Sequence, residues 1–350
     1  MTATLSPQPL RIGILGCANI ARQFVRDVAG SPAVILAAVA SRSAGKAAAF
    51  AAEFGIPRHH ASYEALLADP AIDAIYNPLP NHLHAEWTIR AAQAGRHVLC
   101  EKPLALNQAE ARAMFDAARQ AGVMLLEAYP YWFQPQTGRL VELLQTGAIG
   151  RVMQVQASFG FTLRNPDNIR MKPETGGGAL LDAGSYPASF IRLVMGSAPR
   201  RVSALAVPAA TGVDLATTAT LDWGDGRQAQ LRCAMDVALH RHATVVGSDG
   251  LIETEFLNHT ADALTGHPHG YQPSLMRVRR GAGAGPIETV AAPTGSGFRF
   301  AAEAFARVVA AGDHAAIGRA ARASIDIAAM LDAIAASARG DGQWVALPAA

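Results

Sequence analysis

The first 128 residues alternate short apolar runs with helical segments, and this alternation restricts the possible folds more than any other feature. Runs rich in aliphatic and β-branched residues predict strands at 10–15, 34–40, 74–76, 97–100 and 123–128. The segments between them predict helices at 20–29, 44–54, 63–68, 84–94 and 107–120. Strands that alternate with helices at this spacing indicate βαβ units, and therefore an α/β domain with a doubly wound parallel sheet.

The pattern changes after Tyr129. A helix is expected at 134–146, and β-like runs follow at 151–161, 201–207, 216–223, 228–235 and 243–247. Gly224 to Gly226 reads Gly-Asp-Gly between two of these runs, which is typical of a hairpin. Helical patterns return at 298–310 and 317–336, and a last strand is expected at 344–347. We predict a first domain at 1–128 and, at 129–350, an α+β domain with an open, mainly antiparallel sheet, whose C-terminal helices can pack back on the first domain.

Composition supports this division and argues against several classes of protein. The 350 residues are 50% hydrophobic, which is enough for two cores, and the net charge of +2 gives no basic surface for nucleic acid. Cys17, Cys100 and Cys233 show neither disulfide pairing nor zinc-site spacing. The segment Met1 to Leu10 has no signal-peptide pattern, and no apolar run near it is long enough to span a bilayer. We expect a cytoplasmic protein without nucleic-acid or membrane partners.

A degenerate glycine turn follows the first expected strand and opens a helix. It reads Gly-Cys-Ala-Asn-Ile-Ala from Gly16, with Ala18 and Ala21 in place of the second and third glycines of G-x-G-x-x-G. The glycine permits a tight turn, and the helix N-terminus offers free N–H groups to a pyrophosphate. This position favours a dinucleotide-binding Rossmann fold, in which the turn residues contact the cofactor: Gly16, Cys17, Ala18, Asn19 and Ile20.

The end of the second expected strand indicates which dinucleotide binds. NAD enzymes usually place a carboxylate there for the ribose hydroxyls, whereas this chain has Ser41 and Arg42, with Lys46 a turn later. A hydroxyl and a guanidinium suit a 2′-phosphate, because arginine binds phosphate through two donors. We predict NADP(H) rather than NAD(H); the alternative is that Arg42 is an ordinary solvated loop residue.

Three further segments carry a family resemblance: 76–84 (YNPLPNHLH), 101–103 (EKP) and 176–187 (GGGALLDAGSYP). Together with the glycine turn, they resemble the glucose–fructose oxidoreductase, inositol dehydrogenase and rhizopine-catabolism (Gfo/Idh/MocA) family along essentially the whole chain. Tyr186 at the last motif position is similar to the branch of dihydrodiol dehydrogenases, NADP-dependent D-xylose dehydrogenases and nucleotide-sugar 3-ketoreductases. The relatives often read Tyr-Arg-x-His-Pro-Gln where this chain reads YWFQPQ at 131–136, so a relative's substrate does not transfer directly.

The resemblance implies a Rossmann domain followed by an α/β domain whose open sheet often mediates oligomers, here a homodimer or homotetramer. It also implies that Lys102, Asp182 and Tyr186 line the reacting centre beside the nicotinamide. The segments after the third and fourth strands supply the remaining implied NADP(H) contacts: Pro78, Leu79, Asn81, His84, Glu101 and Lys102. On chemistry alone, His84 is as well explained as loop structure.

Proton exchange with the substrate oxygen must accompany hydride transfer. We expect Tyr186 to be the general acid/base, with the Lys102 ammonium lowering its pKa and polarising the substrate oxygen. Lys102 is alternatively the main proton donor. Asp182 lies four residues before Tyr186, so the two share a face if they lie on one helix, and it orients either the lysine or a substrate hydroxyl. Pro187 weakens that argument, since a proline fits only the first turn of a helix or a kink.

Substrate contacts are predicted only from position before the glycine-rich segment: Tyr131, Trp132, Arg164, Asn168 and Arg170. The histidine pairs His59/His60, His240/His242 and His267/His269 lack a carboxylate or cysteine at ligand spacing, so no metal is expected.

Three functions stay open at this stage. The first is an NADP(H)-dependent dehydrogenase of an aldose, polyol or trans-dihydrodiol. The second is an NADPH-dependent reductase of a nucleotide-linked ketosugar, which differs in substrate size and in direction. The third is a non-catalytic NADP-binding regulator on the same fold. The intact pair of Lys102 and Tyr186 favours an enzyme acting on a small sugar-like molecule.

Overall fold

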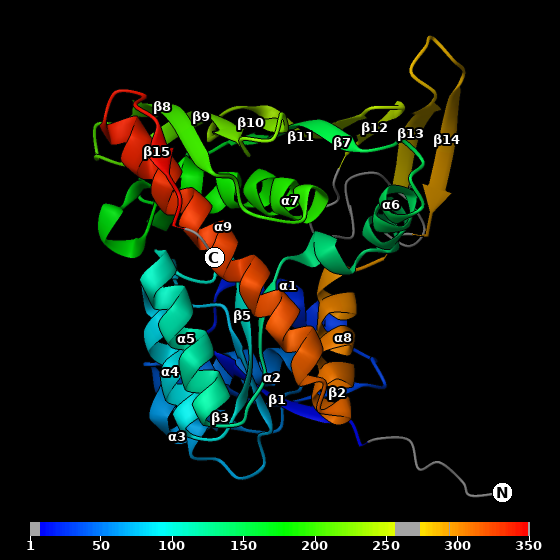
Figure 1. The fold of residues 1–350 in the computed structure, drawn as a ribbon. Coiled ribbons are helices and arrows are strands. Elements are labelled where there is room, and N and C mark those ends of the chain that lie inside the picture. Colours follow the sequence, from blue (N-terminus) through cyan, green and yellow to red (C-terminus); the bar gives the residue numbers. More distant parts are fainter. Residues whose placement is uncertain (1–7, 256–273, 294, 349–350) are drawn as a thin grey trace, which may run out of the picture.

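The computed structural model describes residues 8–255, 274–293 and 295–348. Two sheets lie one above the other, with helices between and around them (Figure 1). The first sheet has six strands in the order β3-β2-β1-β4-β5-β6, and all of its pairings are parallel. These strands are β1 (Leu10–Leu15), β2 (Val34–Ala40), β3 (His59–His60), β4 (Ala74–Asn77), β5 (His97–Glu101) and β6 (Leu125–Ala128).

Helices cover both faces of this sheet. One face packs against α1 (Asn19–Val28), α2 (Ala44–Phe54) and α8 (Gly297–Ala311). The other packs against α3 (Tyr63–Leu67), α4 (His84–Gln93) and α5 (Gln108–Gln120). Apolar side chains at helical spacing drive this burial; Phe24 of α1, for example, stacks on Tyr76 of β4 with ring centroids 3.8 Å apart. The strand order reverses between β1 and β4, so a crevice opens at their carboxyl ends.

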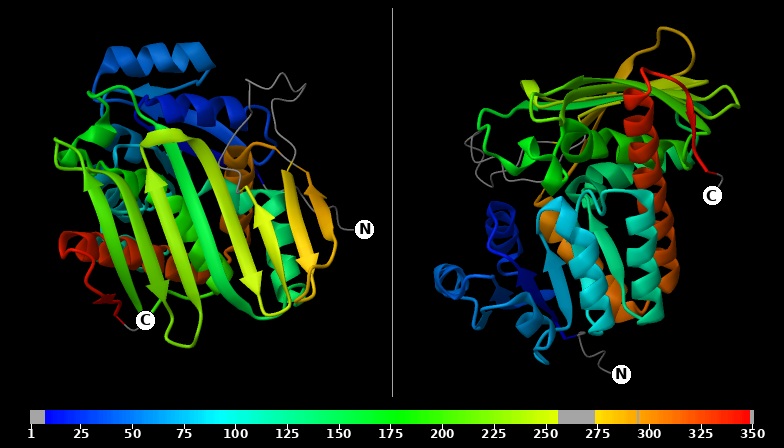
Figure 2. Two further views of the ribbon diagram at one scale, coloured as in Figure 1. Left: turned by 90° about the horizontal axis from the view of Figure 1, so that it is seen from above. Right: turned by 90° about the vertical axis from the view of Figure 1, so that its left-hand side faces the viewer.

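The second sheet has nine strands in the order β14-β13-β12-β11-β7-β10-β9-β8-β15. Within this second sheet, β7–β10 is the one parallel pair among the described strands, and the other pairs are antiparallel. Helices α6 (Pro135–Gln145) and α7 (Ser185–Met195) lie against one face, and in Figure 2 none of the described helices covers the opposite face. The strands are β7 (Val152–Thr162), β8 (Arg201–Pro208), β9 (Asp214–Asp222), β10 (Gln228–Ala234), β11 (Asp236–Gly247), β12 (Gly250–Thr254), β13 (Ser274–Arg280), β14 (Ile287–Ala292) and β15 (Val345–Ala346).

The long helix α9 (His314–Arg339) runs from the first sheet's layer to the second (Figure 1). It contacts α5 and β6 below and α7 and β8 above. Ala328 belongs to a core of the first domain, whereas Met330 belongs to the core of the second. Arg192 of α7 donates to Asp326 over 2.6 Å, and both side chains are 11% exposed. The C-terminal helices α8 and α9 therefore complete the first domain although they follow the second in sequence.

The expected fold class is confirmed: a parallel doubly wound sheet precedes an open, mainly antiparallel one. The expected elements of the first domain lie within a few residues of the observed ones. The expectations omitted β3, β12, β13 and β14, and they did not give the length of α7. The two-residue β3 has no periodicity, and β13 and β14 carry charged and exposed residues that hide their alternation.

Candidate functional site

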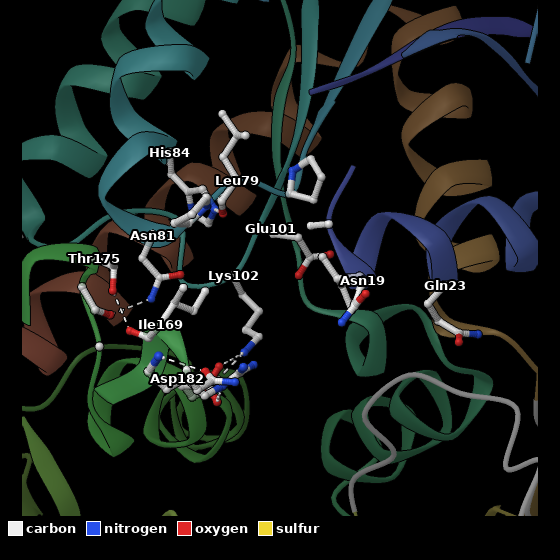
Figure 3. Close-up of a pocket in the computed structure, with 18 of the residues that line it drawn as sticks. Asn19, Gln23, Leu79, Asn81, His84, Glu101, Lys102, Ile169, Thr175 and Asp182 are labelled. Atoms are coloured by element: carbon white, nitrogen blue, oxygen red, sulfur yellow. Dashed lines mark hydrogen bonds and ion pairs between the residues drawn. The ribbon is translucent and has the colours of Figure 1, made fainter. Parts of the chain in front are cut away.

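A cavity of about 780 Å³ lies between the two domains, at the carboxyl ends of the parallel strands (Figure 3). The first domain supplies the start of α1, the loop after β4 and the end of β5. The second supplies β7, the segment 167–177, the turn before α7 and Leu239 of β11. Open α/β sheets bind ligands at this edge, where the strand order reverses. Thirteen of the predicted site residues line the cavity: Ala18, Asn19, Ile20, Pro78, Leu79, Asn81, His84, Glu101, Lys102, Asn168, Arg170, Asp182 and Tyr186.

The glycine turn has the geometry that its pattern predicts. Gly16 has φ +87°, a conformation that favours glycine, and a Cβ there would lie 3.1 Å from Leu79. Ala18 is the N-cap of α1 and offers no side-chain cap, and the first turn holds no acidic residue. Asn19 and Gln23 of α1 reach toward the cavity in Figure 3. Uncapped N–H groups at this positive helix end suit the pyrophosphate of a dinucleotide.

Ser41, Arg42 and Lys46 lie at the end of β2 and the start of α2, beside the turn but outside the cavity wall. The Gly16 N–H donates to Ala40 O over 2.7 Å, so the two loops are adjacent. Arg42 is exposed and lies near Tyr63, and its positive charge opposes the increase in the Tyr63 pKa that burial causes. An exposed cation beside the turn, with no carboxylate at this strand end, fits a 2′-phosphate. The half-buried Cys17 lies 3.6 Å from Lys46 O through its Sγ.

The loops after β4 and β5 are held together by a buried imidazole. His84 Nδ1 lies 2.8 Å from Pro103 O, and His84 Nε2 lies 2.7 Å from Leu79 O. Burial lowers the pKa of His84 to about 4, so the ring is neutral at physiological pH. Asn81 donates from Nδ2 to Gly176 O over 2.8 Å, which joins this loop to the second domain. His84 therefore shapes the cavity wall, as the structural interpretation of this residue expects.

Two charged side chains stand at the end of β5. Tyr76 donates its hydroxyl hydrogen to Glu101 Oε1 over 2.8 Å, and burial raises the pKa of Glu101 to about 7 despite that bond and the nearby Lys102. Lys102 crosses to the second domain, as Figure 3 shows, and donates from Nζ to Asp182 Oδ1 over 3.1 Å and to Asp182 O over 3.2 Å. The exposed fractions of these two side chains are 12% and 13%. The ion pair is thus largely shielded from solvent.

Asp182 and Tyr186 reach the same cavity from consecutive elements. Asp182 lies in a π-helical turn (Leu180–Gly184), and Tyr186 lies in the first turn of α7, where Pro187 is tolerated. Asp182 Oδ2 accepts from Arg170 Nε over 2.6 Å. Burial alone would raise the pKa of Asp182, but the charges of Lys102 and Arg170 outweigh it and hold that pKa well below its usual range. Asp182 is therefore an anion bound by two cations.

The expectation that the pKa of Tyr186 is lowered is wrong, because that pKa is raised. Lys102 Nζ lies 4.7 Å from the centroid of the Tyr186 ring, over its face. Burial raises the pKa of Tyr186 well above 10, the charges of Glu101 and Asp182 add to the increase, and Arg241 and Arg170 only partly oppose it. Desolvation thus prevails over the cationic neighbours, and the phenol is neutral, a form suited to donating a proton.

The predicted substrate residues divide into two groups. Asn168 and Arg170 line the cavity, while Tyr131, Trp132 and Arg164 do not. The Tyr131 hydroxyl is buried 2.7 Å from Ser189 Oγ and accepts from Trp132 Nε1 over 2.7 Å. Sequence reasoning omitted several side chains of the wall: Gln23, Phe159, Phe161, Asp167, Leu239 and Phe298. The two-residue spacing of Phe159 and Phe161 on one strand was the available signal for a shared face.

The described residues contain no group of three or more histidine, cysteine, aspartate or glutamate side chains placed to hold a metal ion. The pair His267/His269, considered above, lies outside the described residues. Within the same ranges, no helix combines the length and apolarity needed to cross a membrane.

Family models match both halves of the chain. Residues 10–129 match the model described as an oxidoreductase family with an NAD-binding Rossmann fold, and residues 138–253 match the GFO/IDH/MocA C-terminal domain. The chain is 35% identical over 330 residues to a D-xylose 1-dehydrogenase (NADP(+)) of Haloferax volcanii, covering 94% of this chain and 97% of that protein. A trans-1,2-dihydrobenzene-1,2-diol dehydrogenase of Xenopus laevis is 37% identical, over 69% of this chain and 74% of the relative.

Solved structures of oxidoreductases are also similar to this chain over nearly its whole length. A 3-ketoreductase from Actinomadura kijaniata, crystallised with NADP and TDP-benzene, superimposes with a TM-score of 0.84 at 31% identity, covering 94% of this chain and 98% of that one. An aldose–aldose oxidoreductase from Caulobacter crescentus, complexed with glycerol, has a TM-score of 0.83 at 27% identity over 97% and 100%. The resemblance inferred from the motifs is thereby confirmed. The chain belongs to the Gfo/Idh/MocA family of oxidoreductases.

Proposed function

We propose that this protein is an NADP(H)-dependent oxidoreductase that moves a hydride to or from a sugar-like alcohol or carbonyl. The observation that carries the proposal is the meeting of Lys102, Asp182 and Tyr186 in the cleft where the parallel strands end. Relatives named as a D-xylose dehydrogenase, a dihydrodiol dehydrogenase and a 3-ketoreductase support the same class of reaction. An intact reacting centre and these relatives favour an enzyme over a non-catalytic regulator.

The residues at the cleft have separate tasks in this reaction. A bound nicotinamide supplies or accepts the hydride. In the reducing direction, the neutral Tyr186 phenol donates a proton to the substrate oxygen, and Lys102 stabilises the negative charge that develops there. Asp182 holds Lys102 in place through Oδ1. In the oxidising direction, the phenolate form of Tyr186 takes the proton of the substrate hydroxyl. Because burial raises the pKa of Tyr186, we expect this direction to be faster at alkaline pH.

We assign the cofactor preference to the end of β2. Ser41 and Arg42 stand where an NAD enzyme has a carboxylate, and Lys46 follows in the first turn of α2. Glycine-turn residues Gly16 to Ile20 bind the pyrophosphate in this proposal. The loop residues Pro78 to His84, with Glu101, form the wall around the nicotinamide ribose.

For the substrate, the charges of the cavity favour an unlinked aldose, polyol or dihydrodiol. A nucleotide diphosphate needs cations that are free to bind it. Among the described residues of the cavity wall, Lys102 and Arg170 both pair with Asp182, and Asp167 adds a negative charge. The second candidate, a reductase of a nucleotide-linked ketosugar, is favoured by the likeness to the 3-ketoreductase crystallised with TDP-benzene.

A substrate panel with both cofactors tests the proposal. The purified protein is assayed for NADP+ and NAD+ reduction with aldoses, polyols and trans-dihydrodiols, and for NADPH oxidation with free and dTDP-linked ketosugars. We expect turnover of unlinked substrates and a kcat/KM that is higher with NADP+. Turnover of dTDP-linked ketosugars alone would favour the second candidate. Tight NADPH binding without turnover of any compound would contradict the enzyme assignment.

The proposal also covers the oligomeric state and the cellular location of the protein. On β8, Leu205 and Val207 are 61% and 56% exposed, whereas Val202 and Ala204 are buried, so an apolar row faces outward on the side of the sheet that none of the described helices covers. We assign this face to a homodimer or homotetramer contact; Leu205→Glu should then lower the mass measured by light scattering. The free thiols of Cys17, Cys100 and Cys233 suit the reducing cytoplasm.

A further inference from the structure

The carboxylate of Asp182 is divided between two cations from different domains. Oδ1 accepts from Lys102 Nζ over 3.1 Å, and Oδ2 accepts from Arg170 Nε over 2.6 Å. Both contacts are charge-assisted, and the arginine contact is the shorter one. The guanidinium carbon of Arg170 also lies 6.0 Å from the centroid of the Phe161 ring. Arg170 is therefore engaged with protein groups, although it lines the cavity.

Lys102 has one more donor than Asp182 uses. A protonated lysine carries three N–H donors. Two are directed at Asp182, at Oδ1 over 3.1 Å and at the main-chain O over 3.2 Å. The third donor remains for an oxygen in the cavity. A carboxylate that is already neutralised by a guanidinium attracts the ammonium less strongly, so the third donor is free to follow the substrate oxygen.

The backbone around Arg170 is fixed with unusual tightness. Its N–H donates to Asn168 Oδ1 over 3.0 Å, and its O accepts from the Gly178 N–H over 2.9 Å. At Gly177 a Cβ would lie 2.5 Å from Arg170 O, so only glycine allows the two segments to approach this closely. Gly176 O accepts from Asn81 of the first domain. The glycine-rich segment thus sets the distance between Arg170 and Asp182.

We propose that Arg170 is a positioning residue: by binding Asp182 Oδ2, it orients the carboxylate and leaves the Lys102 ammonium available to the substrate oxygen. The expected effect on kinetics rests on the proposed function. The ion pair between Arg170 and Asp182 is independent of it. Arg170 does not bind the substrate in this scheme, which changes the role expected from its sequence position. It acts on the reaction only through Asp182 and Lys102.

Kinetics of Arg170→Met and Arg170→Lys separate positioning from substrate binding. We expect Arg170→Met to lower kcat about 10- to 100-fold, the range of one charge-assisted hydrogen bond, with the substrate KM and the NADPH Kd changed less than about threefold. Arg170→Lys should recover most of kcat, because a cation returns to Asp182. Arg232→Met, an exposed arginine on β10 outside the cavity, is the matched control and should behave as wild type.

The pH profile gives a second readout that a fold defect would not produce. Tyr186 faces Glu101, Asp182, Arg241 and Arg170, and Lys102 lies over its ring. Without Arg170, the charge of Asp182 is less compensated, which raises the pKa of Tyr186 further. The alkaline limb of kcat for oxidation should therefore move to higher pH by about one unit in Arg170→Met. A raised KM with unchanged kcat, or a profile identical to wild type, would overturn the proposal.

A stability measurement keeps the inference testable if no substrate is found. The lowered pKa of Asp182 stabilises the fold above pH 4, and this stability is lost as pH falls. Arg170→Met removes part of it, so its Tm should lie below that of wild type at pH 7, and the difference should shrink toward pH 3. A difference in Tm that is constant with pH would refute the Asp182 linkage. This outcome is independent of whether the proposed activity is correct.

Discussion

The two walls of the cleft are built on different principles. The cofactor wall consists of short loops that directly follow parallel strands, and its main groups are backbone N–H donors and a buried imidazole, His84. The substrate wall joins β7, the segment 167–177 and the start of α7, and it is held by side-chain ion pairs centred on Asp182. Lys102 and Asn81 both reach from the cofactor wall to the substrate wall.

This difference determines how each wall tolerates change. Backbone groups on a rigid sheet edge keep their geometry when a neighbouring side chain is replaced. Ion pairs depend on each partner, since a buried charge that loses its partner is costly. Substitutions in the substrate wall should therefore affect turnover most strongly, and those in the cofactor wall should affect binding or stability.

The largest expected effect is that of Tyr186→Phe in the substrate wall. Loss of the phenolic proton should lower kcat by about 10²- to 10⁴-fold, the usual contribution of a general acid. The NADPH Kd, measured by fluorescence quenching, should stay within about twofold, because no ligand of the cofactor wall is changed. Wild-type turnover in this variant would refute the role of Tyr186 and the division between the walls.

The second largest effect is expected on the pH dependence of stability, and it comes from Glu101 in the cofactor wall. The pKa of Glu101 in the folded protein is about 7, above its ordinary value of 4.5. As pH rises, the carboxyl therefore ionises more easily in the unfolded chain than in the folded one, and the folded state loses stability between pH 4.5 and pH 7. Glu101→Gln keeps an acceptor for Tyr76 and removes the titration. It should be more stable than wild type by up to about 3 kcal/mol at pH 8 and by almost nothing at pH 4.

Urea unfolding at both pH values measures this difference. Glu86→Gln, on the exposed surface of α4, is the control and should not change the pH dependence of stability. If Glu101→Gln shows the same pH dependence as wild type, Glu101 is not held in a destabilising buried position.

Gly177→Ala tests the close approach within the substrate wall. A Cβ would lie 2.5 Å from Arg170 O and 2.8 Å from Lys172 O, so backbone must shift. We expect a loss of about 2 kcal/mol in the free energy of unfolding, within the range for overpacking. Gly138→Ala, in α6 with no atom within 4 Å of the added Cβ, is the matched control and should be neutral or slightly stabilising. Equal effects of the two substitutions would contradict the geometry at Gly177.

The smallest effect is expected for Arg42→Ala. Loss of one exposed cation should raise the KM for NADP+ by about tenfold, and the KM for NAD+ should change less than about twofold. Steady-state assays with both cofactors measure the ratio, and Arg58→Ala, an exposed arginine paired with Asp69, is the control. A parallel change in both KM values would remove Arg42 from the 2′-phosphate site.

The contrast between the walls also explains what could be predicted from sequence. The cofactor wall follows from a local signal, namely a strand, a glycine and a helix in order at Gly16. Helix caps elsewhere in the first domain are equally local, such as Asn107, whose Oδ1 accepts from the Glu110 N–H over 2.9 Å. The substrate wall depends on how distant segments pack. Tyr131 and Trp132 looked accessible from their position, but they turn into the second domain's core beside Ser189.

The pKa of Tyr186 also could not be predicted from sequence. Its neighbour Lys102 is visible in the motif at 101–103, whereas the degree of desolvation depends on the aromatic packing around Tyr186, including Tyr129 and Phe159 with ring centroids 5.6 and 5.1 Å away. Because of burial, the pKa of Tyr186 is raised, whereas a lowered pKa was expected. No sequence motif predicts the ion pair of Arg170 with Asp182, because the two residues are twelve positions apart across an irregular segment.

Helix α9 has a consequence for dividing this chain. Ala328 of α9 and Phe298 and Phe305 of α8 complete the cores of the first domain, and Met330 fills that of the second. A fragment that stops at residue 128 would expose the apolar surface that α8 and α9 cover, and a fragment that starts at 129 would carry the apolar side chains of these helices without their partners. The boundary between the domains therefore follows the order of the chain and not the composition of the cores. We expect the first domain to complete its packing only after α8 and α9 have been synthesised.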